Sequence, residues 1–293
     1  MKPIYKIMFF VSVALTITAI VLVAVFGLRF GVDFRGGSLL EIVFNGPRPI
    51  VAELNDLVGG MPGVTNVSIN PAGDRGVLIR LNNIDEQTHQ AILSGIAQKF
   101  GKITENRFDS IGPTIGNELR SKSIKAIVIL LIAIIIYIAL VFRKVERVLS
   151  PWALGVAAVI ALLHDILIPT GVFALLGHYM GIEITAVFVA AALTILGYSL
   201  SDSVVVFDRV RENAIRFGTS QDFGGLVHKS IMQTLVRSLN TTFTTLVALI
   251  AIFLFGGESI KYFALAMIIG IFAGAYSSIF IASPILVWWG RKK

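Results

Sequence analysis

The chain of 293 residues is 55% hydrophobic and 15% charged, with a mean hydropathy of +0.82 and a formal net charge of +7. This composition excludes an ordinary soluble protein, because a chain of this length could not bury so much apolar surface in its own core. It contains no Cys, which excludes disulfides and thiolate metal sites, and we expect neither a metal nor another cofactor. The apolar residues are gathered in runs long enough to cross a hydrocarbon core of about 30 Å. The sequence therefore predicts a membrane protein with several transmembrane helices.

The first apolar run extends from about Ile7 to Leu28 and contains no charged residue. It is longer than the apolar core of a signal peptide, and no convincing Ala-x-Ala cleavage site follows it. We therefore expect residues 1–28 to form a short cytoplasmic tail and an uncleaved first transmembrane helix.

A polar stretch, residues 29–120, follows this run and is predicted to form one compact domain outside the bilayer. The domain is close to neutral, because it holds nine Lys and Arg residues against ten Asp and Glu residues. Its strands are expected at four short runs, Leu39–Phe44, Val64–Asn70, Gly76–Leu81 and Ile103–Asp109. Its helices are expected at Ile50–Val58 and Asp85–Phe100. This order of strands and helices matches the split β-α-β, ferredoxin-like plan.

Turn and cap residues define the ends of these elements. The second and third strands are predicted to form a hairpin across Pro71–Asp74. Asp85 is predicted to cap the second helix, and Gly101 to end it. We expect His89 to be solvated, because it lies on a helix that is predicted to be at the surface of the domain.

Residues 121–293 are predicted to form transmembrane helices 2 to 6, with cytoplasmic loops and a C-terminal tail. The five apolar runs lie at about Ser123–Phe142, Pro151–Leu176, Ile182–Phe207, Asn240–Phe255 and Tyr262–Trp289. The predicted fold class is therefore an α-helical membrane protein with six transmembrane helices. One α+β ferredoxin-like extracytoplasmic domain is predicted between helices 1 and 2.

The orientation follows from Lys and Arg residues, which accumulate in cytoplasmic loops. They occur in the N-terminal tail, in the loops after spans two and four and in the C-terminal tail: Lys2, Lys6, Arg143, Lys144, Arg147, Arg209, Arg211, Arg216, Lys229, Arg237, Arg291, Lys292 and Lys293. The opposite loops hold only Lys261. Both termini are therefore predicted to be cytoplasmic. Because the basic excess lies at the membrane flanks, we expect no nucleic-acid partner.

Asp202 is the first polar residue that needs an explanation, because a charged side chain inside a span costs about 2.5–3.5 kcal/mol on insertion scales. It lies about six residues inside the predicted cytoplasmic end of span four. Thr194, Tyr198, Ser201 and Asp202 recur at helical spacing and so share one face. This stripe indicates either a functional wet face or polar residues that neighbouring helices satisfy by packing.

A second polar stripe begins span five. Gln233, Arg237, Asn240, Thr241 and Thr244 fall on one helical face. The depth of Arg237 is about that of Asp202, so an ion pair between the two helices is geometrically allowed. The alternative is an arginine anchor whose stem extends to the lipid headgroups.

His164 and Asp165 lie near the centre of span three. This pair indicates either a proton relay, since His titrates near physiological pH, or a hydrogen-bonded tie between helices. Span six carries Gly270 and Gly274 at four-residue spacing, which predicts a close approach of another helix.

An enzyme is not expected, because the sequence lacks the H-E-x-x-H, G-x-S-x-G and phosphate-binding Gly-Lys-Ser/Thr motifs. Intramembrane acidic and basic residues are better suited to ion coupling.

Three stretches of the chain resemble the SecF family of bacterial protein-export subunits. The first, GLRFGVDFRGG, spans Gly27–Gly37, and the second, IGPTIG, spans Ile111–Gly116. The third, GYSLSDSVVVFDRVREN, spans Gly197–Asn213 and is the most specific. Ser201 stands where the family commonly has Asn. By the resemblance, Asp202 matches the family's intramembrane acid and Arg237 its associated arginine.

The resemblance implies a protein of the bacterial inner membrane with a SecD-like partner of the same six-span plan. The two halves together resemble the resistance–nodulation–division (RND) transporters, and such complexes are thought to use the proton-motive force in late-stage preprotein translocation. The other partners that it implies are the SecYEG channel, the SecA motor indirectly, an unfolded preprotein, YajC and the lipid bilayer. Two alternatives to this function are half of a proton-coupled transporter of small substrates and a structural membrane subunit without proton coupling.

Overall fold

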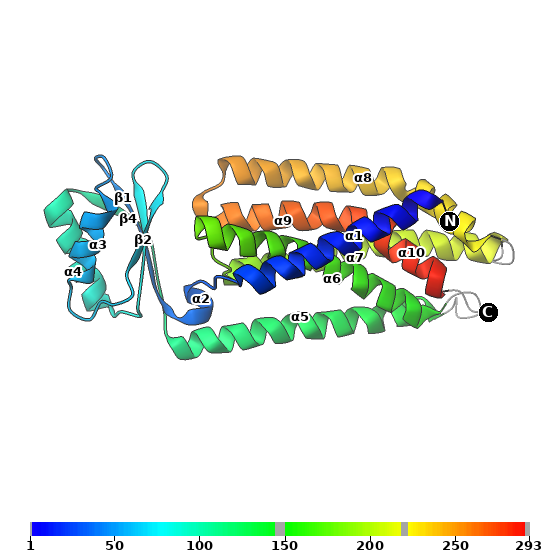
Figure 1. Ribbon diagram of the computed structural model, residues 1–293, viewed down its shortest axis with the longest axis horizontal. Helices are drawn as coiled ribbons and strands as arrows, with labels where there is room; N and C mark the ends of the chain where they lie inside the picture. Colours follow the sequence, from blue (N-terminus) through cyan, green and yellow to red (C-terminus); the bar gives the residue numbers. More distant parts are fainter. Residues whose placement is uncertain (1, 144–149, 218–221, 291–293) are drawn as a thin grey trace. The chain divides into compact units, whose positions relative to one another are not determined.

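A computed structural model describes residues 2–143, 150–217 and 222–290 (Figure 1). Lys144, Arg147 and Arg291–Lys293, whose charges enter the predicted orientation, lie outside the described residues. Contacts divide the chain into two compact units: Met1–Arg29 together with Lys125–Lys293 form one, and Phe30–Ile124 form the other.

Six helical segments of the described residues are apolar and long enough to cross a membrane, which confirms the predicted number of spans. The first five are α1 (Pro3–Phe26), α5 (Pro113–Val141), α6 (Pro151–Met180), α7 (Ala186–Phe217) and α8 (Phe223–Phe255). The sixth begins as α9 (Glu258–Ser277) and continues through a π-helical turn (Ser278–Ala282), α10 (Ser283–Ile285) and a second π-helical turn (Leu286–Gly290).

Three of these helices extend beyond the predicted spans by ten residues or so, or more. Helix α7 continues beyond Phe207, α8 begins before Asn240, and α5 begins before Ser123. Helices α7 and α8, of 32 and 33 residues, are close to 50 Å long at about 1.5 Å per residue, whereas the hydrocarbon core is about 30 Å thick. The extra turns are amphipathic and charged, so hydropathy alone does not reveal them.

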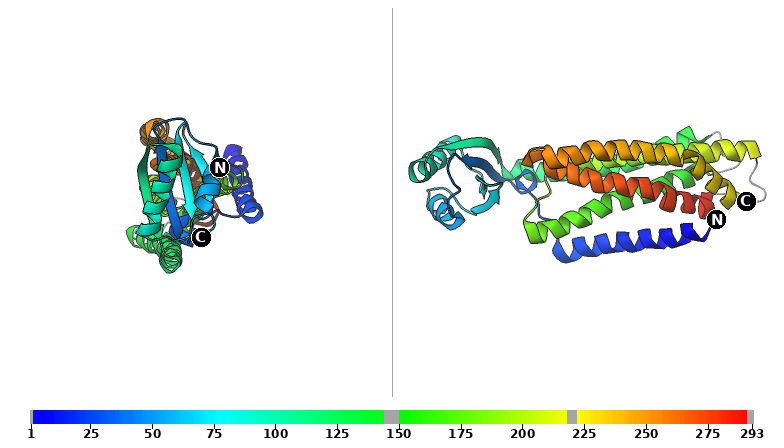
Figure 2. Two further views of the ribbon diagram at one scale, coloured as in Figure 1. Left: turned by 90° about the vertical axis from the view of Figure 1, so that its left-hand side faces the viewer. Right: turned by 90° about the horizontal axis from the view of Figure 1, so that it is seen from above.

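The helical core lies around α9, which packs against α6, α7 and α8 (Figures 1 and 2). Small residues permit close approach of helices elsewhere in this unit too, as between α6 and α1. A Cβ at Gly171 of α6 would lie 2.7 Å from the Cα of Ala19 in α1. Helices α6 and α7 are therefore enclosed by neighbours over much of their length, and many of their side chains are buried.

The sixth span departs from a regular α-helix at Ser278. Pro284 supplies no N–H to the preceding turn, and its ring disfavours regular α-helix there. The hydroxyl of Ser283 donates to the carbonyl of Ser278 over 2.8 Å and so satisfies one carbonyl of the π-helical turn. Single π-helical turns in a helix are rare and occur frequently at functional sites.

The second unit holds the sheet. Its elements are α2 (Val32–Arg35), β1 (Gly37–Phe44), α3 (Val51–Gly59), β2 (Ser68–Ala72), β3 (Gly76–Leu81), α4 (Glu86–Phe100) and β4 (Ile103–Ile111). The strand order is β2-β3-β1-β4, and all neighbouring strands are antiparallel. Helices α3 and α4 cover one face of the sheet (Figures 1 and 2). Alternate residues of β1, among them Leu40 and Ile42, are buried against that helical layer together with Leu54 and Ile92.

The second strand does not lie where the sequence predicts it. Instead of Val64–Asn70, the strand is β2, and Pro71 and Ala72 pair with β3 rather than forming the turn. Asn66 has a φ of 56°, which interrupts an extended backbone before β2. Pro71 is tolerated because β2 is an edge strand, where one side of the backbone needs no partner.

The predicted solvation of His89 is wrong. The side chain is buried and stacks on Phe108, with ring centroids 3.7 Å apart and an interplanar angle of 4°. Its Nδ1 lies 3.2 Å from Glu86 and its Nε2 3.2 Å from Glu105. His89 shares its helical face with Ile92, so it faces β4 rather than solvent.

Candidate functional site

The carboxylate of Asp202 lies at the junction of three helices. Ser238 of α8 donates a hydrogen bond to its Oδ1, and Ser278, at the end of α9, donates to its Oδ2 over 2.6 Å. Both donors are hydroxyls with little surface of their own exposed. Each carboxylate oxygen therefore has a neutral hydrogen-bond donor from a different helix, as a polar group in a membrane span requires.

A second acid, Asp165 of α6, is completely buried. Its Oδ1 lies 2.9 Å from Nδ1 of His164, and its Oδ2 accepts from Ser199 of α7 over 2.5 Å and from Ser277 of α9 over 2.8 Å. The Nε2 atom of His164 is buried and has no hydrogen-bond partner among the described residues. An imidazole that donates from Nδ1 is left with an acceptor at Nε2, so this ring has one free proton-accepting position.

The two acids are connected through α9. Ser277 contacts Asp165 and the next residue, Ser278, contacts Asp202. Gly274 makes this arrangement possible, because a Cβ at that position would lie 2.9 Å from the Cβ of Ser199 and 3.5 Å from the carboxylate of Asp165. Two acids on different helices thus accept hydrogen bonds from the adjacent hydroxyls of Ser277 and Ser278 in the sixth span.

Arg237 does not pair with Asp202. The two residues are both described, and no ion pair joins them; the α8 residue that contacts Asp202 is Ser238. Arg237 is exposed on the surface of the chain, and its carbonyl accepts from Thr241 over 3.0 Å. Consecutive helical residues point about 100° apart, so a helix that presents Ser238 to the acid directs Arg237 away from it.

The remaining members of the α8 stripe are also exposed. Gln233 accepts a hydrogen bond from the buried Asn213 of α7 over 2.9 Å, whereas Asn240, Thr241 and Thr244 lie on the open surface of the chain. The hydroxyl of Thr244 donates to the carbonyl of Asn240. These residues form an exposed polar surface along the middle of α8.

The α7 stripe divides into two parts. Thr194 and Ser201 are exposed, and the hydroxyl of Thr194 donates to its own helix at Ala190. Tyr198 and Asp202 are half-buried, and the Tyr198 hydroxyl lies 3.4 Å from that of Thr245 in α8. The stripe therefore borders the α7–α8 contact, with only Asp202 reaching the serines of both neighbouring helices.

Gly270 and Gly274 both face α7. The side chain of Ile195 occupies the space beside Gly270, and Ser199 lies beside Gly274. The four-residue spacing places them one above the other on α9, so that α7 approaches closely along this line. The glycines therefore set the distance across which Ser199 and Ser277 meet at Asp165.

Sequence reasoning missed most of the hydroxyls of this site. Ser199, Ser238, Ser277 and Ser278 contact the two acids. All four lie in or beside segments that the sequence analysis considered, but none was assigned to either acid. The available signal was the spacing of small polar residues among apolar ones. Ser199 precedes Asp202 by three residues, which is one helical turn.

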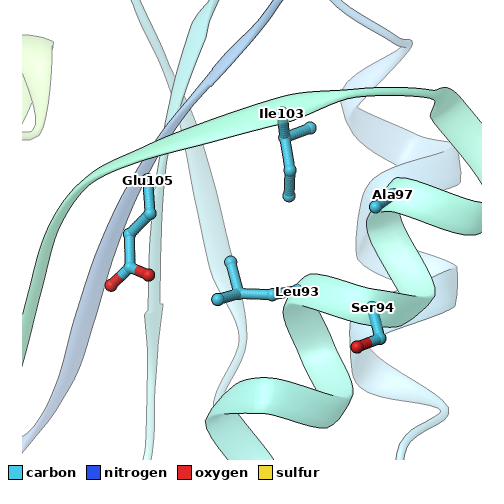
Figure 3. A pocket seen from close by; sticks show the side chains of 5 residues that line it. All are labelled: Leu93, Ser94, Ala97, Ile103 and Glu105. Atoms are coloured by element: carbon cyan, nitrogen blue, oxygen red, sulfur yellow. The ribbon is translucent and has the colours of Figure 1, made fainter.

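The second unit contains a shallow concavity of about 260 Å³ between α4 and β4 (Figure 3). It is lined by residues of both elements: Leu93, Ser94, Ala97, Ile103 and Glu105. This volume lies below the range of about 300–1,000 Å³ that is usual for small-molecule sites, and most of its lining is apolar. It is a weaker candidate site than the buried acids.

Two acids lie at the N-terminus of helix α4, Asp85 and Glu86. The backbone N–H of Thr88 donates to Asp85, as the sequence predicts for a helix cap, and this bond lowers the pKa of Asp85. A hydrogen bond from Gln90 lowers the pKa of Glu86, with a further contribution from His89. Both shifts favour the ionised carboxylates at a helix N-terminus.

Two family models match this chain. Residues 92–292 match the family described as "Protein export membrane protein SecD/SecF, C-terminal". The chain belongs to the SecD/SecF family. Residues 21–47 match the "SecD/SecF GG Motif", which includes the glycines between α2 and β1.

Individual members of the SecD/SecF family match almost the whole chain. "Protein translocase subunit SecF" of Thermobaculum terrenum is 42% identical over 295 residues, which cover 97% of this chain and 92% of the relative. The protein of the same name from Anaerolinea thermophila is 40% identical and covers 96% and 91%, respectively.

A solved structure has the same fold. SecDF of Thermus thermophilus, described as "a translocon-associated membrane protein", superposes with a TM-score of 0.83 at 33% identity over 97% of this chain. The chain spans only 38% of the length of that SecDF chain. The family is therefore shown both by sequence and by structure.

Proposed function

We propose that this chain acts as a SecF-type subunit that couples proton movement across the bacterial inner membrane to late-stage preprotein translocation through the Sec channel. The observation that carries the proposal is the carboxylate of Asp202, held inside a membrane-spanning bundle by hydroxyls of α8 and α9. An ionisable residue at this depth is costly and is found chiefly where protons or ions move. The names of the relatives support the assignment to protein export.

A SecD-type partner with six spans follows from the exposed polar surface of α7 and α8. Thr194, Ser201, Arg237 and Asn240 are exposed in the single chain. Facing lipid, Ser201, Arg237 and Asn240 would lose the hydrogen bonds of water without gaining others. Since the SecDF relative contains a further stretch longer than this chain, we infer that a second half covers the polar surface.

Proton coupling at Asp202 would use two adjacent residues of α8. Ser238 contacts the carboxylate, and Arg237, the preceding residue, points about 100° away from it around the helix. A positive guanidinium favours the ionised carboxylate, whereas a hydroxyl also accommodates the protonated acid. A rotation of α8 would therefore exchange one partner for the other as the proton enters or leaves. His164 and Asp165 are proposed as a relay beside this site.

The remaining assignments extend the proposal to the whole complex. The α+β unit is a ferredoxin-like domain on the extracytoplasmic side, supported by its strand order, and both termini are cytoplasmic. The proposed partners of the whole chain are SecD, the SecYEG channel, an unfolded preprotein, YajC and, indirectly, SecA. The domain is proposed to move with the spans and to assist the emerging preprotein.

Proton flux tests the proposal. Vesicles that contain the complex with its SecD-type partner and a pH-sensitive dye are supplied with preprotein, and native protein is compared with Asp202→Asn. We expect the preprotein-dependent flux to be lost. Asp208→Asn is the matched control, because Asp208 lies on the same helix but forms an exposed ion pair with Arg211 at 2.7 Å.

A structural role is the second candidate, favoured by one observation: both oxygens of Asp202 are already satisfied by serines, as in a packing contact. A subunit that only braces the complex would retain preprotein-dependent proton flux after Asp202→Asn. It would lose assembly after replacement of the close-packed Gly274 by a larger residue.

A further inference from the structure

We propose that Ser277 and Ser278 couple the proton occupancy of Asp165 to that of Asp202, so that the bundle contains two interdependent proton-binding acids rather than one. The inference rests on the proposed function, because it concerns the same site. It starts from the finding that adjacent residues of α9 contact the two acids, which lie on α6 and α7.

Each of these serines has two alternative acceptors. The hydroxyl of Ser277 lies 2.8 Å from Oδ2 of Asp165 and 3.2 Å from the carbonyl oxygen of Gly274. The hydroxyl of Ser278 lies 2.6 Å from Oδ2 of Asp202 and 3.2 Å from the carbonyl oxygen of Ala275. A hydroxyl has one hydrogen to donate, so it favours either the carboxylate or the backbone.

Protonation exchanges these bonds. When Oδ2 of Asp202 binds a proton from the aqueous pathway, the new O–H donates to the Ser278 oxygen. The hydrogen of Ser278 then turns to the carbonyl of Ala275, so that one proton is gained and every hydrogen keeps an acceptor. The same exchange at Asp165 turns the Ser277 hydroxyl to Gly274. A hydroxyl can serve both states because it both donates and accepts.

The two exchanges take place on one short piece of backbone. The carbonyls of Gly274 and Ala275 belong to the last turn of α9, and the π-helical turn begins at Ser278. A new hydrogen bond to either carbonyl competes with the helical bonds of that turn and alters the orientation of the neighbouring serine. A proton on one acid therefore changes how well the other acid is hydrogen-bonded.

Few other titratable groups face the two acids. His164 lies beside Asp165 on α6, and the ring of Tyr276 on α9 lies 6.2 Å from that of His164. Among the described residues, the hydrogen bonds to the Asp202 carboxylate come from two hydroxyls, those of Ser238 on α8 and Ser278 at the end of α9. Ser277 and Ser278 thus contact one acid each from adjacent positions of the chain, and His164 lies on the Asp165 side.

The test is an infrared titration of Asp202 in the complete complex, embedded in a lipid bilayer. The carboxyl band of Asp202 is identified by its absence in Asp202→Asn. We expect Asp165→Asn to shift the titration midpoint of that band by about half a pH unit or more, a change of roughly threefold in proton affinity. In the Ser277→Ala/Ser278→Ala background the shift is expected to disappear.

These variants leave each acid with a hydrogen-bond donor, since Ser199 remains at Asp165 and Ser238 at Asp202. Ser203→Ala is the control, because its hydroxyl is buried on α7 and has no partner among the described residues. No shift on Asp165→Asn would overturn the coupling, and a shift that survives the double serine replacement would assign it to charge alone. Export after Asp202→Asn is measured separately, so failure of the proposed function is distinguishable from failure of the coupling.

Discussion

Ser278 donates a hydrogen bond of 2.6 Å to the carboxylate of Asp202. Ser278 is also the residue at which helix α9 ends and a π-helical turn begins. The acid therefore contacts the least regular part of the sixth span. In the proposed function, a proton that enters at Asp202 would act on a backbone segment near Pro284, which supplies no N–H to the preceding turn. This relationship offers a physical route from a single proton to the movement of a helix.

Removal of the Ser278 hydroxyl is expected to weaken coupling without abolishing it. In Ser278→Ala, Asp202 keeps its bond from Ser238 but loses one donor. A hydrogen bond to a charged group contributes about 1.5–3 kcal/mol, so gradient-dependent export should fall roughly tenfold or more. Export in vesicles at matched protein abundance measures the effect. The prediction fails if Ser203→Ala, the control, reduces export by as much.

Gly274 is expected to tolerate no side chain. A Cβ would lie 2.9 Å from the Cβ of Ser199, so Gly274→Ala forces α9 away from α7. Overpacking of this kind costs about 1–3 kcal/mol. Thermal unfolding of the purified chain in detergent should show a lower midpoint. Gly197→Ala is the control, because a Cβ there meets no atom within 4 Å, and an equal loss in both variants would refute the packing argument.

Replacement of Arg237 is expected to impair export without lowering stability, whereas replacement of Ser238 is expected to lower stability. Arg237 is exposed and makes no ion pair with Asp202, so Arg237→Ala should leave the thermal unfolding midpoint of the single chain unchanged. It should nevertheless abolish gradient-dependent export, because the proposed exchange of partners needs the guanidinium. Ser238→Ala should lower the unfolding midpoint, since it removes a buried donor from the carboxylate. Full export with Ala at position 237 would contradict the proposed role of the arginine.

His89 is expected to stabilise the contact between α4 and β4. His89→Ala removes the stack on Phe108, and such aromatic pairs contribute about 0.5–1.5 kcal/mol beyond the area that they bury. Amides of α4 should therefore exchange their hydrogens faster in the variant. His89→Phe preserves the stack and should retain more protection than the alanine variant. Equal protection of α4 in native protein and His89→Ala would show that the stack is unimportant.

The start of α4 is expected to lose stability in acid. Hydrogen bonds lower the pKa of Asp85 and Glu86 in the folded state, so their contribution is present above the unfolded pKa values of about 3.9 and 4.3. It is lost as the pH falls through the lower folded values. Protection factors of the first-turn amides, corrected for intrinsic exchange, should decrease over that range. In Asp85→Asn, which still caps the helix but does not titrate, the Asp85 part of this dependence should be absent.

Hydropathy predicted the number of spans because a bilayer demands long apolar runs, whatever the packing inside. It did not predict where α7 ends or where α8 begins, since their charged turns obey the rules of amphipathic helices in water. The cap at Asp85 was predicted and is observed, because it depends on residues that are close in sequence. The placement of β2 failed because the conformation of Asn66 does not follow from hydrophobic pattern.

The sequence predicted how deep Asp202 and Arg237 lie in their helices, but not which residues contact Asp202. Asp202 and Arg237 were recognised at similar depths, yet depth does not fix the rotation of a helix about its axis. That rotation decides whether Arg237 or Ser238 meets the acid, and the structure selects Ser238. The serine contacts depend on interhelical distances set by Gly274, which no property of a single helix reveals.

The proposed proton coupling at Asp202 is best tested by measuring the gradient-dependent fraction of preprotein export in vesicles that contain the complete complex. Native protein, Asp202→Asn and the control Asp208→Asn are compared at equal abundance, with and without a proton gradient. If Asp202 couples proton movement to export, Asp202→Asn loses only the gradient-dependent fraction, whereas Asp208→Asn keeps it. Gradient-dependent export that persists in full in the Asp202→Asn protein would contradict the account.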